Sequence, residues 1–127
     1  MAIRLPQPPR DLTNLIELGQ WLENIWNHVR GTVVVTGDAV ATIGSGETYH
    51  GITALSATRT ITMAPAASYQ DGDEIIIQDE SGAAGTYTVT ISRSGSDTIN
   101  GGASVTITSN YGRRRIIKRG AGKFYSA

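Results

Sequence analysis

A regular stripe of apolar residues constrains the N-terminal part of this chain more than any other feature. Its members are separated by steps of three, four, three and four residues: Leu15, Leu18, Leu22, Ile25 and Val29. On a helix over residues 12–29, this spacing places all of them on one narrow seam, as in a coiled coil. No later segment reads as a second helix. The seam therefore predicts that other copies of the same chain supply the partner helices.

The residues around the seam indicate where its helix begins and ends. Asp11 is a candidate N-cap, because its carboxylate can accept hydrogen bonds from the free amides of the first turn. Gly31 suits the position just after a helix. We therefore predict an extended arm over residues 1–11, an oligomerising helix over 12–31 and a β domain over 32–127. Because about two heptads are too short to be stable alone, the β domain must help to hold the chains together.

The predicted arm is rich in proline. Leu5 is followed closely by Pro6, Pro8 and Pro9, a composition that prevents helix formation and favours extended polyproline II. Such a segment is either an unattached terminus or an arm that becomes ordered on a partner. The predicted oligomer favours the anchoring arm.

From Thr32 onward the apolar period changes from helical to alternating, with threonine-rich opposite faces. Strands are expected at residues 32–36, 59–63, 74–78, 86–92, 104–108, 115–118 and 123–125. The stretch 37–51 reads as loop with one short strand at most. Turn dipeptides such as Asp71-Gly72 and Asn100-Gly101 separate the strands. Their spacing predicts an antiparallel β-sandwich or small barrel.

The composition excludes several classes of function. The formal net charge is +0, so no general basic field attracts nucleic acid. The chain has no cysteine, which excludes disulfides, thiolate zinc sites and cysteine nucleophiles. No run approaches the roughly 18 apolar residues of a membrane span, and the N-terminus lacks the apolar core of a signal peptide. We expect no nucleic-acid and no membrane partner, and synthesis in a cytoplasm.

The residues that could carry chemistry are scattered. His28 and His50 have no second histidine at metal-ligand spacing. The acidic stretch 71–80 lacks the spacing of an EF-hand, and we interpret it as a solvated rim or as a contact with a basic neighbour. The sequence therefore predicts no metal, no cofactor and no catalytic residues.

A basic stretch near the C-terminus could be that neighbour. It contains no acid over residues 113–123. We predict charge contacts between subunits, formed by Asp71, Asp73 and Glu74 on one side and by Arg113, Arg114 and Arg115 on the other.

A longer series of turns and strands carries a resemblance to a known family. The series includes Asp71-Gly72-Asp73-Glu74-Ile75, Tyr87-Thr88-Val89-Thr90-Ile91, Asp97-Thr98-Ile99-Asn100-Gly101 and Gly122-Lys123-Phe124-Tyr125. In this order, over residues 55–125, it resembles a β-domain found in virion proteins of tailed bacteriophages, namely fibre, head-fibre and decoration proteins. Two features depart from that pattern: Phe124 stands where similar domains usually have tryptophan, and the run Arg113–Arg115 is unusually basic.

The resemblance implies a structural protein of the virion, not an enzyme, and a homotrimer. The seam alone does not choose between two, three and more chains. The small size favours a short head-decoration or head-fibre appendage, with the arm docked on capsid or another virion protein. The alternative is a tail-fibre or receptor-binding module whose β-domain contacts a host surface glycan.

Overall fold

The computed structural model describes Gly19, Gln20, Leu22 and residues 31–127, and its described part is built mainly from strands. Gly19, Gln20 and Leu22 are helical. The arm over residues 1–11 and the remainder of the predicted helix lie outside the described residues. Strands account for 44% of the chain, so the prediction of a mostly β protein is confirmed.

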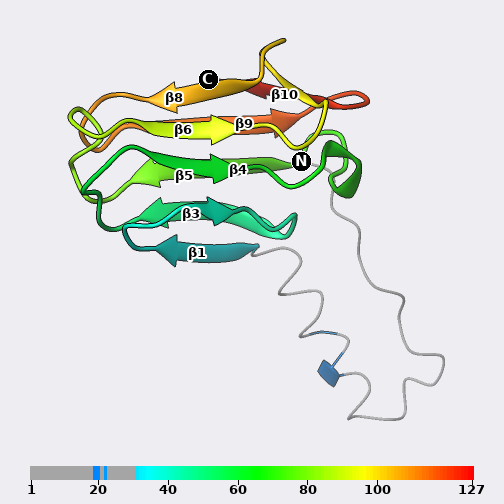
Figure 1. Ribbon diagram of the computed structural model, residues 1–127. Helices are drawn as coiled ribbons and strands as arrows, with labels where there is room; N and C mark the ends of the chain where they lie inside the picture. Colours follow the sequence, from blue (N-terminus) through cyan, green and yellow to red (C-terminus); the bar gives the residue numbers. More distant parts are fainter. Residues whose placement is uncertain (1–18, 21, 23–30) are drawn as a thin grey trace, which may run out of the picture.

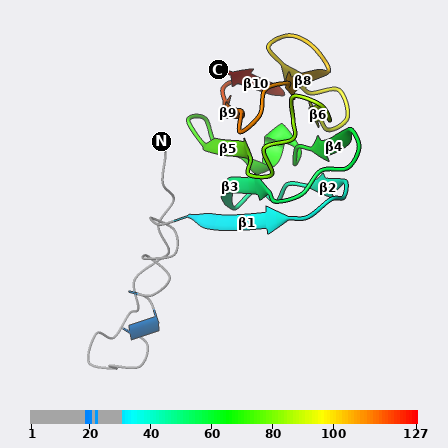
Figure 2. The same ribbon diagram turned by 90° about the vertical axis from the view of Figure 1, so that its left-hand side faces the viewer.

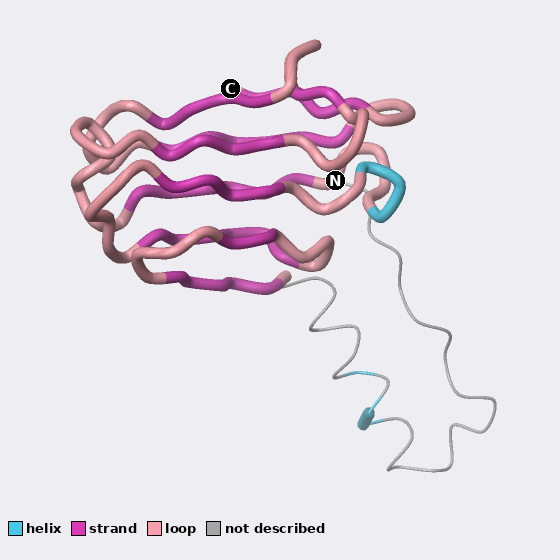
Figure 3. Tube along the Cα trace, viewed as in Figure 1, coloured by secondary structure: helices cyan, strands magenta, loops and turns pink. Residues whose placement is uncertain are grey.

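The described strands form two sheets that lie face to face (Figures 1 and 2). The larger sheet has the order β1 (Thr32–Thr36), β3 (Glu47–Ile52), β5 (Glu74–Asp79), β9 (Arg113–Lys118), β10 (Lys123–Ser126) and β7 (Thr98–Ile99). The smaller sheet has the order β2 (Ala41–Thr42), β4 (Arg59–Thr62), β6 (Val89–Ser92) and β8 (Ser104–Ile107). A short 3-10 helix, η1 (Ala66–Ser68), lies in the connection between β4 and β5 (Figure 3).

The chain crosses between the sheets at each of its first steps, so that neighbours within a sheet run parallel. Strands β1, β3 and β5 are parallel to one another, and so are β2, β4 and β6. Antiparallel pairs involve β8, β9 and β10, and β10 also pairs in parallel with β7. The prediction of an antiparallel domain is thus right for the pairs made by β8 and β9, and wrong for the pairs among β1 to β6 and for the pair β7–β10. Inward and outward side chains alternate with the same period in parallel and antiparallel sheets, so the sequence pattern could not distinguish the two.

The space between the sheets is filled by aliphatic side chains, mostly isoleucine. Ile52, Ile77 and Ile116 come from the larger sheet, and Ile61 and Ile91 from the smaller one, all at most 1% exposed. Their neighbours along each strand point outward, as the period of two requires. On the smaller sheet these outward residues are hydroxylic, with the cross-strand row Thr60, Thr90 and Thr106. The predicted threonine-rich face is therefore the outer face of the smaller sheet.

Of two turns predicted from the sequence, one has the expected backbone conformation and the other has its positive φ at a different residue. Asn100 (φ 52°) and Gly101 (φ 79°) both have positive φ between the paired residues Ile99 and Gly102, the conformation of a tight type I′ hairpin. In the Asn110-Tyr111-Gly112 turn, however, the left-handed residue is Tyr111 (φ 58°) and not the glycine.

One buried carboxylate joins two of these turns. Asp79, at the end of β5, is 0% exposed. It accepts hydrogen bonds from the backbone N–H groups of Ser81, Gly82, Ala84 and Tyr111 at 3.0–3.2 Å, and from the Ser81 hydroxyl at 2.5 Å. These N–H groups lie in turns, where the buried carboxylate takes the place of a backbone acceptor. Asp79 thereby fixes the connection between β5 and β6 against the turn before β9.

Candidate assembly site

The first strand of each sheet lies at one end of the sandwich, where both sheets stop. β1 and β2 are terminal in their sheets, and each has a strand partner on one side only. Figure 2 shows the two strands together at the lower end of the domain. The free side of such a strand presents unpaired N–H and C=O groups, which can pair with another chain. We call this region the open end, and define it by β1, β2 and residues 37–40 between them.

Exposed apolar side chains gather at the open end. Among the described residues, the exposed large hydrophobic ones are Leu22, Val33, Val35, Val40, Tyr111 and Tyr125. Half of them belong to the open end: Val33 is 69% exposed, Val35 57% and Val40 68%. β1 reads Thr-Val-Val-Val-Thr and contains no charge and no proline. It therefore lacks the features that usually protect an edge strand from pairing.

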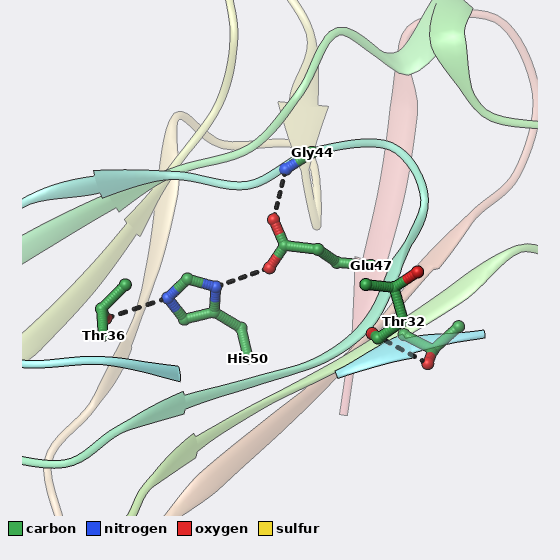
Figure 4. A network of polar contacts seen from close by, with 6 residues as sticks. Thr32, Thr36, Gly44, Glu47 and His50 are labelled. Carbon is green, nitrogen blue, oxygen red and sulfur yellow. Dashed lines mark hydrogen bonds and ion pairs between the residues drawn. The ribbon is translucent and has the colours of Figure 1, made fainter. Parts of the chain in front are cut away.

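A buried polar network holds the inner face of β1 (Figure 4). Nε2 of His50 lies 3.1 Å from Oγ1 of Thr36, and its Nδ1 lies 2.7 Å from Oε1 of Glu47. The other carboxylate oxygen of Glu47 accepts from the Gly44 N–H at 2.5 Å. Because a carboxylate only accepts, Nδ1 donates to Glu47, and in the neutral ring Nε2 accepts from the Thr36 hydroxyl. The network thus connects β1 through β3 to the turn that precedes β3.

A hydroxyl, an imidazole and a carboxylate in this order also occur in acyl-transfer enzymes. In such a site the imidazole must exchange protons with a bound substrate. His50 is 1% exposed and both of its ring nitrogens are already engaged within the chain. The arrangement suits a structural role, in which a buried imidazole has both nitrogens satisfied.

Replacing His50 with alanine is expected to lower the free energy of unfolding by about 2 to 3 kcal/mol, because Glu47 and Thr36 lose their buried partner. Thr36→Val removes one hydrogen bond and keeps the side-chain shape, and should cost about 1 kcal/mol. Urea unfolding measures both values, and amide hydrogen exchange of β1 shows whether the loss is local. Equal stability of His50→Ala and the wild type would contradict the role assigned to the network.

An ion pair fixes the loop after β1. Nε of Arg59 donates to Oδ1 of Asp38 at 2.7 Å, and the Ser56 hydroxyl donates to the other carboxylate oxygen. The Arg59 guanidinium, followed by Ser56, holds the pKa of Asp38 well below its usual range. The C-terminal end of β1 and the loop beyond it are therefore bound to the rest of the sandwich.

Several of the charged residues predicted to contact another subunit have ion-pair partners within their own chain. Nε and Nη2 of Arg115 each donate to Glu74 at 2.6 Å, between the neighbouring strands β9 and β5. Lys118 donates to Asp71 at 2.8 Å. Arg115 thus meets its acid in its own chain, because β5 and β9 are paired. A contact of Arg113 with another copy stays a prediction.

The other members of these two groups are also used internally. Asp73 accepts from the Gln70 N–H at 2.8 Å. Nε of Arg114 donates to the Thr106 carbonyl at 2.8 Å, which links β9 to β8 of the other sheet. An inter-subunit role for either side chain stays a prediction.

The predicted seam and the predicted arm both precede the open end in the sequence. Leu15, Leu18, Ile25 and Val29 of the seam, and Leu5, Pro6, Pro8 and Pro9 of the arm, are outside the described residues. Leu22 is described, is helical and is 53% exposed.

The described part contains no group of three or more histidine, cysteine, aspartate or glutamate side chains that could hold a metal ion. It also contains no helix that is long and apolar enough to cross a membrane.

Sequence reasoning missed the residues that hold β1 in place and the exposure of its valines. His50 and Glu47 fall in the stretch read as loop, and their spacing of three residues gave no metal or catalytic signal. The run Val33-Val34-Val35 predicts a strand, but an unbroken β-branched run does not show which of its faces is exposed. No protein-family model matches the chain, and no curated protein matches it either.

Proposed function

We propose that this chain is a structural subunit of a tailed-bacteriophage particle: a short homotrimeric head-decoration or head-fibre appendage attached through its N-terminal arm. The resemblance of residues 55–125 to virion β-domains supports the particle, and the seam within residues 12–29 supports self-assembly. The observation that carries the proposal is the open end. An ordered, uncharged valine strand lies where the predicted coiled-coil helix joins the domain, as expected of a subunit that assembles with copies of itself.

In the proposed subunit, each successive segment of the chain has its own role. The arm docks on capsid or another virion protein, the seam assembles the copies, and the β domains form the outward part. Such a subunit performs no catalytic step and needs no cofactor. Cryo-microscopy of the particle tests this directly: density of three sandwich domains on the head supports it, and their absence from the particle overturns it.

Deleting residues 1–10 is expected to abolish binding to the particle while leaving the oligomer intact, because the predicted seam begins only at Leu15. Co-sedimentation of purified protein with particles that lack it measures binding, and light scattering measures the oligomer. The control is Arg119→Ala, which changes an exposed residue far from the arm in sequence. Undiminished particle binding by the truncated protein would contradict the anchoring role of the arm.

A second candidate function rests on two exposed tyrosines. Tyr111 is 66% exposed and Tyr125 is 50% exposed, and aromatic faces in water are the usual platforms for sugar rings. They favour a tail-fibre or receptor-binding module that contacts a host surface glycan. A glycan array separates the candidates: binding that Tyr111→Ala removes supports the receptor module, and an empty array supports the head appendage.

A further inference from the structure

We infer that the outer face of β1 is a self-association surface, on which Val33 and Val35 of parallel copies pack together around a common axis. The inference extends the proposed self-assembly to residues outside the seam, and it does not depend on attachment to a particle. Three observations carry it: the side-chain pattern of β1, the rigidity of the strand, and its junction with the predicted helix.

The side chains of β1 divide cleanly between its two faces. Thr36 points inward to His50, so Val34 shares the inner face and Val33 and Val35 point outward. Val33 is paired with Tyr49 on β3, and Val35 is paired with Gly51, which has no side chain. Val35 therefore has no cross-strand side chain beside it on that face, and both valines stand free.

The surroundings of the valines resemble the rim of an interface. The Tyr49 hydroxyl donates to Oε2 of Glu80 at 3.0 Å across Gly51. A methyl group at Gly51 would collide with that Glu80 carboxylate, at 1.5 Å. The polar pair is thus fixed beside the valines and does not cover them. An apolar centre with a satisfied polar border is the common anatomy of a protein–protein contact.

Hydrogen bonds at both ends of β1 oppose any rotation that would bury the valines. Besides the His50 network, the Thr36 carbonyl accepts from the Thr53 N–H at 2.8 Å and from the Thr53 hydroxyl at 3.0 Å. The Thr32 carbonyl accepts from the Thr48 hydroxyl at 3.3 Å. Since β1 is held at both ends, its apolar outer face cannot turn into the sandwich, and no other described residue is free to cover it.

The position of β1 directly after the predicted seam favours a second copy of the chain as the partner of its outer face. Gly31 has φ +75°, and a Cβ at this position would lie 2.4 Å from the Thr48 side chain. Gly31 therefore lies closely against β3 at the point where β1 begins. The last seam residue, Val29, stands close before Val33 in sequence. Helices that associate in parallel along the seam bring their β1 strands to the same axis.

The absence of cysteine from the chain allows a direct test with the full-length protein. Val33→Cys, Val35→Cys and, as a control on another exposed position, Tyr125→Cys are treated with a short bifunctional maleimide. Parallel packing predicts efficient crosslinks within Val33→Cys and within Val35→Cys, and few within Tyr125→Cys. Crosslinks that form only when Val33→Cys and Val35→Cys are mixed would show antiparallel edge pairing and overturn the inference. Absence of crosslinks at both valines would overturn it as well.

The energetic contribution is measured with Val33→Asp/Val35→Asp against the matched pair Tyr111→Asp/Tyr125→Asp. Burying two valines predicts that the first variant weakens self-association by about 100-fold or more, and that the control leaves it unchanged. Sedimentation velocity over a range of concentrations gives the dissociation constants. Self-association of the valine variant equal to the wild type would overturn the inference.

A seam variant, Leu18→Asp/Ile25→Asp, separates this inference from the proposed function. If it dissociates while the valine variant stays assembled, the seam proposal stands and the β1 inference fails. If both dissociate and the valine variant still unfolds cooperatively in urea, the inference is supported. Should the valine variant not fold, the cysteine crosslinks decide.

Discussion

Replacing Asp79 with alanine is expected to lower the free energy of unfolding by about 3 to 5 kcal/mol, because several turn N–H groups lose their buried acceptor. The carboxylate is 0% exposed and receives backbone hydrogen bonds from Ser81, Gly82, Ala84 and Tyr111. Domains of this size are stable by roughly 5 to 15 kcal/mol, so the change removes a large part of the total. Urea unfolding measures it.

Two further variants give this prediction its controls. Asp79→Asn keeps the shape and one acceptor but places an amide donor among donors, and it should fall between alanine and the wild type. Glu80→Gln changes the adjacent, exposed acid and should cost less than about 0.5 kcal/mol. An Asp79→Ala protein as stable as the wild type would contradict the role assigned to the carboxylate.

The buried Asp79 carboxylate also makes the stability of the protein depend on pH. Burial alone would raise the pKa of Asp79, but the hydrogen bonds from Ser81, Ala84 and Tyr111 outweigh it and hold the pKa below its usual value. A group whose folded pKa is lowered stabilises the protein above its unfolded pKa of about 3.9, and this contribution is lost as pH falls through the folded value. We expect stability to fall below about pH 4 and to fall less steeply in Asp79→Asn, as measured by urea unfolding between pH 7 and acid.

Replacing Phe124 with alanine is expected to cost about 3 to 5 kcal/mol, the range for removing a buried aromatic ring. Phe124 is 2% exposed and contacts the ring of Tyr69 edge-on, with centroids 5.4 Å apart and planes at 87°. The contact attaches the last strand, β10, to the segment after η1. Phe124→Leu retains most of the apolar volume and should cost less than half as much.

The neighbouring residue supplies the control for Phe124. Tyr125→Ala lies on the opposite face of β10, is 50% exposed in the wild type, and should change stability by less than about 0.5 kcal/mol. Thermal and urea unfolding of the three variants measure the order of their stabilities. If Phe124→Ala and Tyr125→Ala were equally stable, Phe124 would not belong to the core as placed.

Strands could be predicted from the sequence where their inward residues are apolar. The expected strand 32–36 coincides with β1, and 74–78 with most of β5, whose Ile75 and Ile77 are buried. β3 falls mostly within the stretch 37–51, where only loop with one short strand was expected, because its inward positions include Thr48 and His50 and show no apolar alternation. A buried histidine is recognisable only when the tertiary structure supplies its partners.

The arrangement of the strands was harder to predict than their positions. Dipeptides such as Ser81-Gly82 favour tight turns, which indicated hairpins. In the fold, that turn lies between β5 and β6, which belong to different sheets. Local turn chemistry reverses or redirects the chain, but it does not decide which sheet receives the next strand. The same limit applies to the site: the seam is a local pattern, whereas the open end arises from strands paired across the chain.

The mass of the full-length protein in solution tests the central claim, that this chain assembles with copies of itself, most directly. Light scattering coupled to size-exclusion chromatography should give about three times the chain mass of 13.5 kDa at micromolar concentration. A single species of 13.5 kDa under these conditions would contradict both the seam and the valine surface of β1.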